Sequence, residues 1–176
     1  MKKATIPLDS SPEHAAALGR LIGHWAIVEF SLSDIFQKLS GTPKRNKASL
    51  ILESIVSVKT RLDIIERLIQ HFVADCKLKT ELEALMTETR DLNSERNAIV
   101  HAAWTGGSGG ILKRIRTGVP YNPKIRSHKT KDFSAEDIQD VVDRIASLAQ
   151  RLIDYDVYQI ARLPIQATPL RRPRGQ

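Results

Sequence analysis

Four segments of the chain repeat apolar residues at alternating steps of three and four, the spacing that gives a helix one apolar face. These stripes cover residues 18–39, 51–72, 78–103 and 138–155. Four such faces can enclose one shared core, and the short connections between the first three segments favour antiparallel neighbours. The pattern therefore predicts an all-α fold, an antiparallel four-helix up-down bundle.

Local signals at two helix ends support this division of the chain. Pro12 follows a serine and suits the first position of a helix. Ser134 and Asp137 have the spacing of a capping box, and Phe133 and Ile138 can form the hydrophobic staple that often accompanies one. We therefore expect the first helix to begin near residue 12 and the last just after residue 134.

The connection between the third and fourth helices breaks the pattern. Residues 105–132 have no helical period, but apolar and polar residues alternate around 111–117, which predicts a basic loop or β-hairpin insertion. From residue 164 the chain is rich in proline and arginine, a composition typical of disorder. The sequence thus predicts one domain over residues 1–163, with its insertion at about 105–132, and a disordered basic tail over 164–176.

Positive charge is concentrated in the insertion and the tail. The net charge is +7, but residues 105–131 and 157–176 together hold eleven basic residues and no acidic one. Such a distribution suits a polyanion such as a nucleic acid. The alternative is that the charge only keeps two loops solvated. The candidate RNA-binding residues in the insertion are Lys113, Arg114, Arg116, Lys124, Arg126, Lys129 and Lys131.

Several functional classes are disfavoured by the composition. No apolar run is long enough to cross a membrane, and the N-terminus lacks the apolar core of a secretory signal. Cys76 is the single cysteine, so neither an internal disulfide nor a cysteine-rich zinc site can form. No spacing of histidine and acidic residues indicates a metal site, and we expect no cofactor. The sequence predicts a cytoplasmic protein.

Arg96 lies on the apolar stripe of the third helix, where the other helices have aliphatic or aromatic side chains. A charge there is costly unless it is paired or faces a ligand or partner. No carboxylate lies three or four residues away, so a partner must come from elsewhere. The carboxylates that could pair with it on neighbouring helices are Glu29, Glu53 and Asp63.

Asn97 and His101 are four residues apart and lie one above the other beside Arg96. Together the three residues offer a fixed cation, an amide and an imidazole, which suit the charge and the proton transfers of a phosphodiester. A histidine near a helix end is also often a plain cap. The residues alone leave both interpretations open.

The segment ERNAIVHAAW, residues 95–104, resembles the signature of the HEPN superfamily, in which an arginine and a polar residue precede a histidine near the end of a bundle helix. Arg96, Asn97 and His101 fit it, and the resemblance covers residues 12–160. It implies a metal-independent endoribonuclease, acting as a homodimer whose two motifs face each other across a groove. Many members are toxins or phage-defence effectors, so an antitoxin protein is a further expected partner.

The resemblance also implies roles for the residues. His101 would be the general acid or base, Arg96 would stabilise the phosphorane, and Asn97 would orient the phosphate or the imidazole. Glu29, beside the stripe of the first helix, is a candidate supporting residue. In members silenced by a nucleotidyltransferase, a tyrosine stands two residues after the histidine. Here Ala103 takes that place, which argues against this control.

Two other functions stay open. The chain could be a catalytically inert module of the same family that binds RNA or a protein, or a structural adaptor in which Arg96 forms an interface ion pair. We expect Trp104 to be a core residue at the helix end, and His24 and His71 to be ordinary bundle residues.

Overall fold

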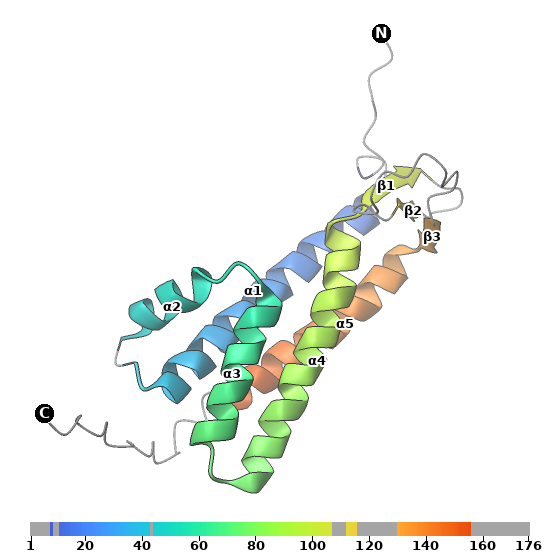
Figure 1. Cartoon of the computed structure of the whole chain (residues 1–176). Coiled ribbons are helices and arrows are strands. Elements are labelled where there is room, and N and C mark those ends of the chain that lie inside the picture. Colours follow the sequence, from blue (N-terminus) through green and yellow to red (C-terminus); the bar gives the residue numbers. More distant parts are fainter. Residues whose placement is uncertain (1–7, 9–10, 43, 107–111, 116–129, 156–176) are drawn as a thin grey trace, which may run out of the picture.

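The computed structural model describes residues 8, 11–42, 44–106, 112–115 and 130–155 (Figure 1). The described part is mostly helical and carries one small sheet. In chain order its elements are α1 (Pro12–Ser40), α2 (Arg45–Glu53), α3 (Val58–Phe72), α4 (Cys76–Val100), β1 (Ala103–Gly106), β2 (Leu112–Ile115), β3 (Thr130–Phe133) and α5 (Ala135–Asp154). The predicted basic tail lies outside these residues.

The four long helices enclose the core through the stripes that the sequence predicts. α1 packs against α3 and α5, and α4 packs against the same two helices. Trp25 of α1, Leu62 of α3, Leu92 of α4 and Ile145 of α5 are all fully or almost fully buried. Burial of each such side chain contributes about 1.5–3 kcal/mol, which makes this core the main source of stability.

The first and last helices run in the same direction, contrary to the predicted up-down arrangement. His14 Nε2 lies 3.1 Å from the carbonyl oxygen of Phe133, and Arg20 Nε donates to Gln139 Oε1 at 2.9 Å. Both pairs are 119 residues apart, a constant separation that only parallel chains can give. The reason is the extra short helix α2, which adds a reversal between α1 and α3 (Figure 1).

The predicted second helix is divided in two. Its stripe was expected to continue over residues 51–72, but α2 ends at Glu53 and α3 begins at Val58. The Ser57 side chain accepts the N–H of Thr60 at 3.3 Å and caps α3. Arg61 Nε donates to the carbonyl oxygen of Ile55 at 2.7 Å. The break therefore has its own hydrogen bonds, which a periodic pattern cannot reveal.

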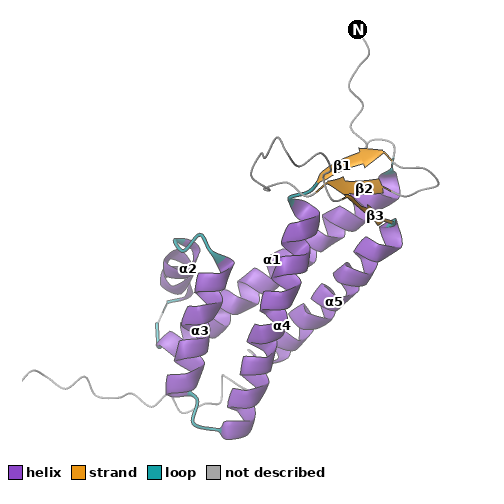
Figure 2. Cartoon of the chain, turned by 45° about the vertical axis from the view of Figure 1, so that its right-hand side comes forward, coloured by secondary structure: helices purple, strands orange, loops and turns teal. Residues whose placement is uncertain are grey.

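Three short antiparallel strands, in the order β1-β2-β3, connect α4 to α5. They lie at the end of the bundle, beyond α4 and beside the first turns of α1 and α5 (Figure 2). The half-buried ring of Trp104 packs against the core and meets Phe133 edge to face at 5.9 Å. β3 leads directly into the predicted capping box, in which Ser134 and Asp137 each accept the other's N–H.

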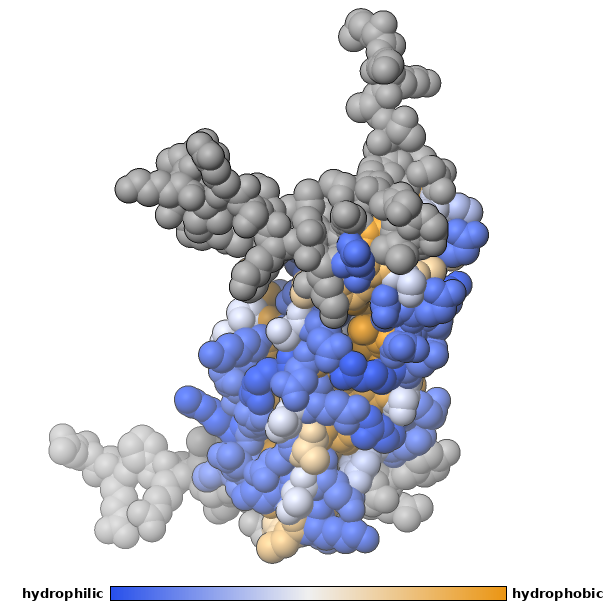
Figure 3. Space-filling model, turned by 90° about the vertical axis from the view of Figure 1, so that its right-hand side faces the viewer, coloured by the Kyte–Doolittle hydropathy of each residue, from blue (hydrophilic) through white to orange (hydrophobic). Residues whose placement is uncertain are grey.

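No described helix is both long and apolar enough to span a membrane. The right-hand side of the molecule in Figure 1, seen face-on in Figure 3, is mainly hydrophilic, and apolar side chains show only in narrow areas between the polar ones.

Candidate functional site

Arg96 lies on the core side of α4 and is held by two uncharged groups. Its guanidinium carbon lies 5.7 Å from the centroid of the Trp25 ring on α1, a cation–π contact. Its Nη1 donates to Asn97 Oδ1 at 2.8 Å. Trp25 is 1% exposed, so the surrounding core holds its ring in place under the guanidinium. Neither contact neutralises the positive charge of the guanidinium.

Two buried N–H groups at this stack have no hydrogen-bond acceptor in the part of the chain that the structure describes. They are Arg96 Nε and Trp25 Nε1. A buried donor without an acceptor costs about 1–3 kcal/mol, and most buried polar groups in proteins avoid that cost. Such a cost is found most often where function, rather than stability, selects the residue.

Two of the three carboxylates that the sequence offered as partners of Arg96 form ion pairs with other arginines. Glu29 lies 3.7 Å from Arg61, and Asp63 lies 3.0 Å from Arg90. Glu53 is exposed on α2. Within the described ranges, no ion pair joins Arg96 to a carboxylate. Glu29, expected to support the motif, instead stabilises the contact between α1 and α3.

Arg90 shows what a structural arginine on α4 looks like. Its guanidinium binds Glu66 at 2.8 and 2.9 Å and Asp63 at 3.0 Å, all on α3. The hydrogen bonds with Glu66, more than those with Asp63, raise the pKa of Arg90, against an opposing effect of burial. Arg96 lies six residues further along the same helix. In place of such a network it has the cation–π contact with Trp25 and one hydrogen bond to the Asn97 amide.

His101 is exposed at the end of α4, where its backbone N–H donates to the carbonyl oxygen of Asn97 at 3.1 Å. The Asn97 amide in turn donates to Asn93 Oδ1 at 3.4 Å. The structure thus joins Arg96 directly to Asn97 and places His101 one turn beyond Asn97. The backbone of His101 caps the helix, and its exposed imidazole is accessible from solvent.

The candidate RNA-binding residues are placed only in part. Lys113 and Arg114 are in β2 and Lys131 is in β3, and Arg114 is the register partner of both Trp104 and Lys131. β1, which pairs with β2, begins two residues after His101. This brings a basic strand to the end of α4 that carries the motif. Arg116, Lys124, Arg126 and Lys129 lie outside the described residues.

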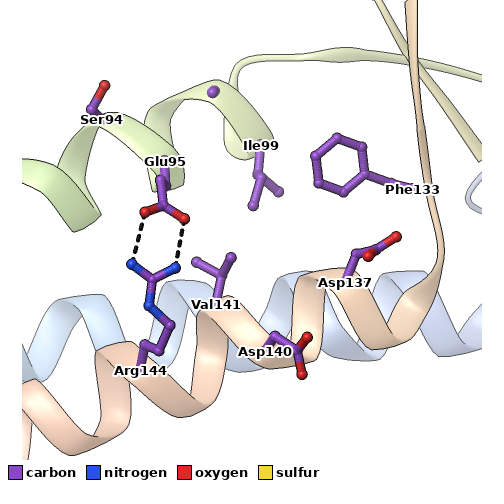
Figure 4. Close-up of a pocket in the computed structure, with 9 residues that line it drawn as sticks. Ser94, Glu95, Ile99, Phe133, Asp137, Asp140, Val141 and Arg144 are labelled. Atoms are coloured by element: carbon purple, nitrogen blue, oxygen red, sulfur yellow. Dashed lines mark hydrogen bonds and ion pairs between the residues drawn. The ribbon is translucent and has the colours of Figure 1, made fainter.

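A pocket of about 500 Å³ lies between α4, α5 and β3, on another face of α4 (Figure 4). Glu95 accepts two hydrogen bonds from Arg144 at 2.8 and 2.9 Å across it, and these raise the pKa of Arg144. Neither Arg96 nor Asn97 lines it. No local pattern in the sequence indicates this pocket, because its walls come from three separate segments of the chain. Its lining is Ser94, Glu95, Ala98, Ile99, Phe133, Asp137, Asp140, Val141 and Arg144.

Among the described residues, no group of three histidine, cysteine or acidic side chains is placed to hold a metal ion. No family model, curated protein or solved structure matches the chain. A function can therefore be inferred only from the arrangement of Arg96, Asn97 and His101 at the end of α4.

Proposed function

We propose that the chain is a HEPN-like, metal-independent endoribonuclease whose site lies at the C-terminal end of α4. The observation that carries the proposal is Arg96, a cation on the core side of the helix that, among the described residues, is held by Trp25 and Asn97 and by no carboxylate. An arginine without a carboxylate partner keeps its charge and its donors for an anionic ligand. The exposed imidazole of His101, one turn away, adds a group that transfers protons.

The reaction would be a transesterification within the RNA. The 2′-oxygen forms a bond to the adjacent phosphorus, and the bond from phosphorus to the 5′-oxygen breaks. The 2′-hydroxyl gives up a proton and the 5′-oxygen gains one, and His101 serves one of these transfers as general base or acid. Arg96 stabilises the negative charge that builds on the phosphorane, while Asn97 holds the guanidinium in place. The products are a 2′,3′-cyclic phosphate and a 5′-hydroxyl.

The basic insertion would supply phosphate contacts beside the motif. β2 carries Lys113 and Arg114 and lies in the sheet that begins directly after α4. Such contacts attract any nucleic acid, and their strength falls as salt rises. The selection of RNA over DNA would come from the chemistry, because only RNA has the attacking 2′-hydroxyl.

The test is cleavage of total RNA and tRNA in EDTA, with the ends of the products analysed. His101→Ala should slow cleavage by about 10²–10⁴-fold, the usual contribution of a general acid or base. His71→Ala is a matched control, because His71 is also exposed in the last turn of a helix and should be dispensable. Cleavage by His101→Ala at the wild-type rate would refute the mechanism.

A second substrate separates this chemistry from a contaminating nuclease. RNA with a single 2′-deoxynucleotide at the mapped site should be bound and left uncut there. Arg96→Lys keeps the charge but loses the planar fork, so its cleavage should be reduced as well. Cleavage at the deoxy position would contradict transesterification.

A binding module without catalysis is the second candidate, and the basic strand beside α4 favours it. It requires that RNA be bound but not cut by the wild-type chain. Lys113→Gln with Arg114→Gln should then weaken binding and lower its salt dependence, since two phosphate contacts would be lost. His101→Ala should leave that binding unchanged.

A further inference from the structure

The guanidinium of Arg96 is turned away from the side of α4 on which the residue itself lies. Arg96 and His101 are five residues apart, which places them about 140° apart around an ideal helix. Asn97 and His101 are four residues apart and therefore lie on the same side. Because Arg96 Nη1 donates to Asn97 Oδ1 at 2.8 Å, the guanidinium is turned toward the side that carries His101. The proposed reaction requires both groups at one phosphate, so the residues that fix this turn affect catalysis.

Trp25 supports the guanidinium from the opposite side of the core. α1 and α4 lie diagonally across the bundle, because each packs against α3 and α5 rather than closely against the other. Only long side chains can meet across such a diagonal, and here the guanidinium carbon of Arg96 lies 5.7 Å from the centroid of the Trp25 ring. Indole is the side-chain ring that attracts a cation most strongly. The face of the guanidinium is thus held by a different helix from the one that carries the motif.

A tryptophan at position 25 is costly for a residue that only fills the core. Trp25 is 1% exposed, and its Nε1 has no hydrogen-bond acceptor in the part of the chain that the structure describes. Leu21 and Val28, its neighbours on the buried side of α1, fill the same core without a polar atom. A leucine at position 25 would likewise avoid the buried donor. It would not supply an aromatic face for the cation.

We infer that Trp25 is a positioning residue, whose indole holds the Arg96 guanidinium where it can meet a phosphate beside His101. The inference rests on the proposed function, since it concerns the geometry of the same site. Trp25 holds the face of the guanidinium and Asn97 holds one of its nitrogens, which leaves the Nη2 donors for a phosphate oxygen. A displacement of about 1 Å at such a site can cost about a hundredfold in rate.

Steady-state cleavage of RNA in EDTA tests this role through Trp25→Leu and Trp25→Phe. Leucine keeps the position apolar but removes the aromatic face, whereas phenylalanine retains a smaller one. We expect Trp25→Leu to lower kcat about ten- to a hundredfold and to leave KM within about threefold of wild type, because Arg96 still carries the charge that attracts the phosphate. Trp25→Phe should recover most of the rate. A wild-type kcat in Trp25→Leu, or equal losses in the two variants, would overturn the inference.

Ile35→Ala is the matched control for lost core packing. Ile35 is fully buried on the same helix and lies ten residues, or about 15 Å, from Trp25. Like Trp25→Leu it removes buried volume, so it should also lower the urea midpoint. At a temperature where circular dichroism shows every variant folded, Ile35→Ala should keep the wild-type kcat. An equal fall in kcat in this control would assign the effect of Trp25→Leu to packing and overturn the inference.

The Nε–H signal of Arg96 in a ¹H–¹⁵N NMR spectrum tests the stack in the wild-type chain without any RNA. This group is buried and close to the indole ring, so its proton should exchange slowly and be shifted upfield of those of exposed arginines by the ring current. Arg96→Lys identifies the signal by removing it, and Trp25→Leu should abolish the upfield shift. A wild-type signal without that shift would contradict the inference.

The two experiments distinguish failure of the inference from failure of the proposed function. A wild-type chain that cleaves no RNA, although its Arg96 signal is shifted, refutes the proposed function and removes the catalytic role of Trp25 with it. A wild-type chain that cleaves RNA, and whose kcat survives Trp25→Leu, refutes the positioning role alone. The result that supports both is cleavage whose kcat falls in Trp25→Leu, recovers in Trp25→Phe and is unchanged in Ile35→Ala.

Discussion

Replacement of Arg96 by methionine tests whether this arginine serves function or stability. Methionine keeps most of the apolar length but removes the charge and the N–H groups. The chain loses the contact with Trp25, worth about 0.5–1 kcal/mol, and the hydrogen bond to Asn97, worth about 1.5 kcal/mol. It is relieved of the buried Nε donor without an acceptor, which costs about 1–3 kcal/mol. The free energy of unfolding should therefore change by between a loss of about 1.5 and a gain of about 1 kcal/mol.

The assay is urea unfolding followed by circular dichroism, at one protein concentration for all variants. Arg90→Met is the matched control on the same helix, because it leaves Asp63 and Glu66 without their shared partner. We expect it to lose about 1–2 kcal/mol. A loss of about 3 kcal/mol or more in Arg96→Met is the size expected when a buried ion pair is broken. That result would refute our account of Arg96 and favour the structural adaptor.

Two further predictions concern the last helix. Burial, and then the hydrogen bond to Glu81, raise the pKa of Tyr155 to about 12. The folded state thus holds this proton more tightly than the unfolded state, so the contribution of Tyr155 to stability is fully present below pH 10 and is lost as pH rises toward 12. Tyr155→Phe should make the urea midpoint less dependent on pH between 10 and 12, and a midpoint that depends on pH as in wild type would count against this explanation. Ser134→Ala removes one half of the capping box and should cost about 1 kcal/mol in urea unfolding, whereas Ser134→Asp, which keeps an acceptor for the Asp137 N–H, should recover most of it.

Features that depend on neighbouring residues could be predicted from the sequence. The stripe of α5 is buried from Ile138 to Leu152, as its period indicates. The capping box forms between Ser134 and Asp137 because both partners lie within one turn. Periodicity and capping are local rules, and they hold wherever the rest of the fold does not oppose them.

Features that depend on distant residues could not be predicted. Periodicity fixes which side of a helix is buried but not the direction in which the helix runs, so the parallel course of α1 and α5 has no local signal. Ile51 and Ile55 continue the stripe across the break between α2 and α3, and this continuity hides the helix start that Ser57 caps. Likewise, the sequence marked Arg96 as unusual, but only the packing of α1 against the rest of the bundle could bring Trp25 to it.

The pairing of the first helix with the last also determines the order in which the chain can fold. Contacts between α3 and α4, such as Arg90 with Glu66, span 24 residues, while those between α1 and α5 span 119. Closing the longer loop costs more entropy, so the α3–α4 hairpin should form early and α1 should dock late. During synthesis α2 and α3 can cover part of the apolar face of α1, but the part that packs against α5 stays exposed until α5 emerges. The first helix is therefore the segment of the nascent chain most exposed to aggregation and to chaperones.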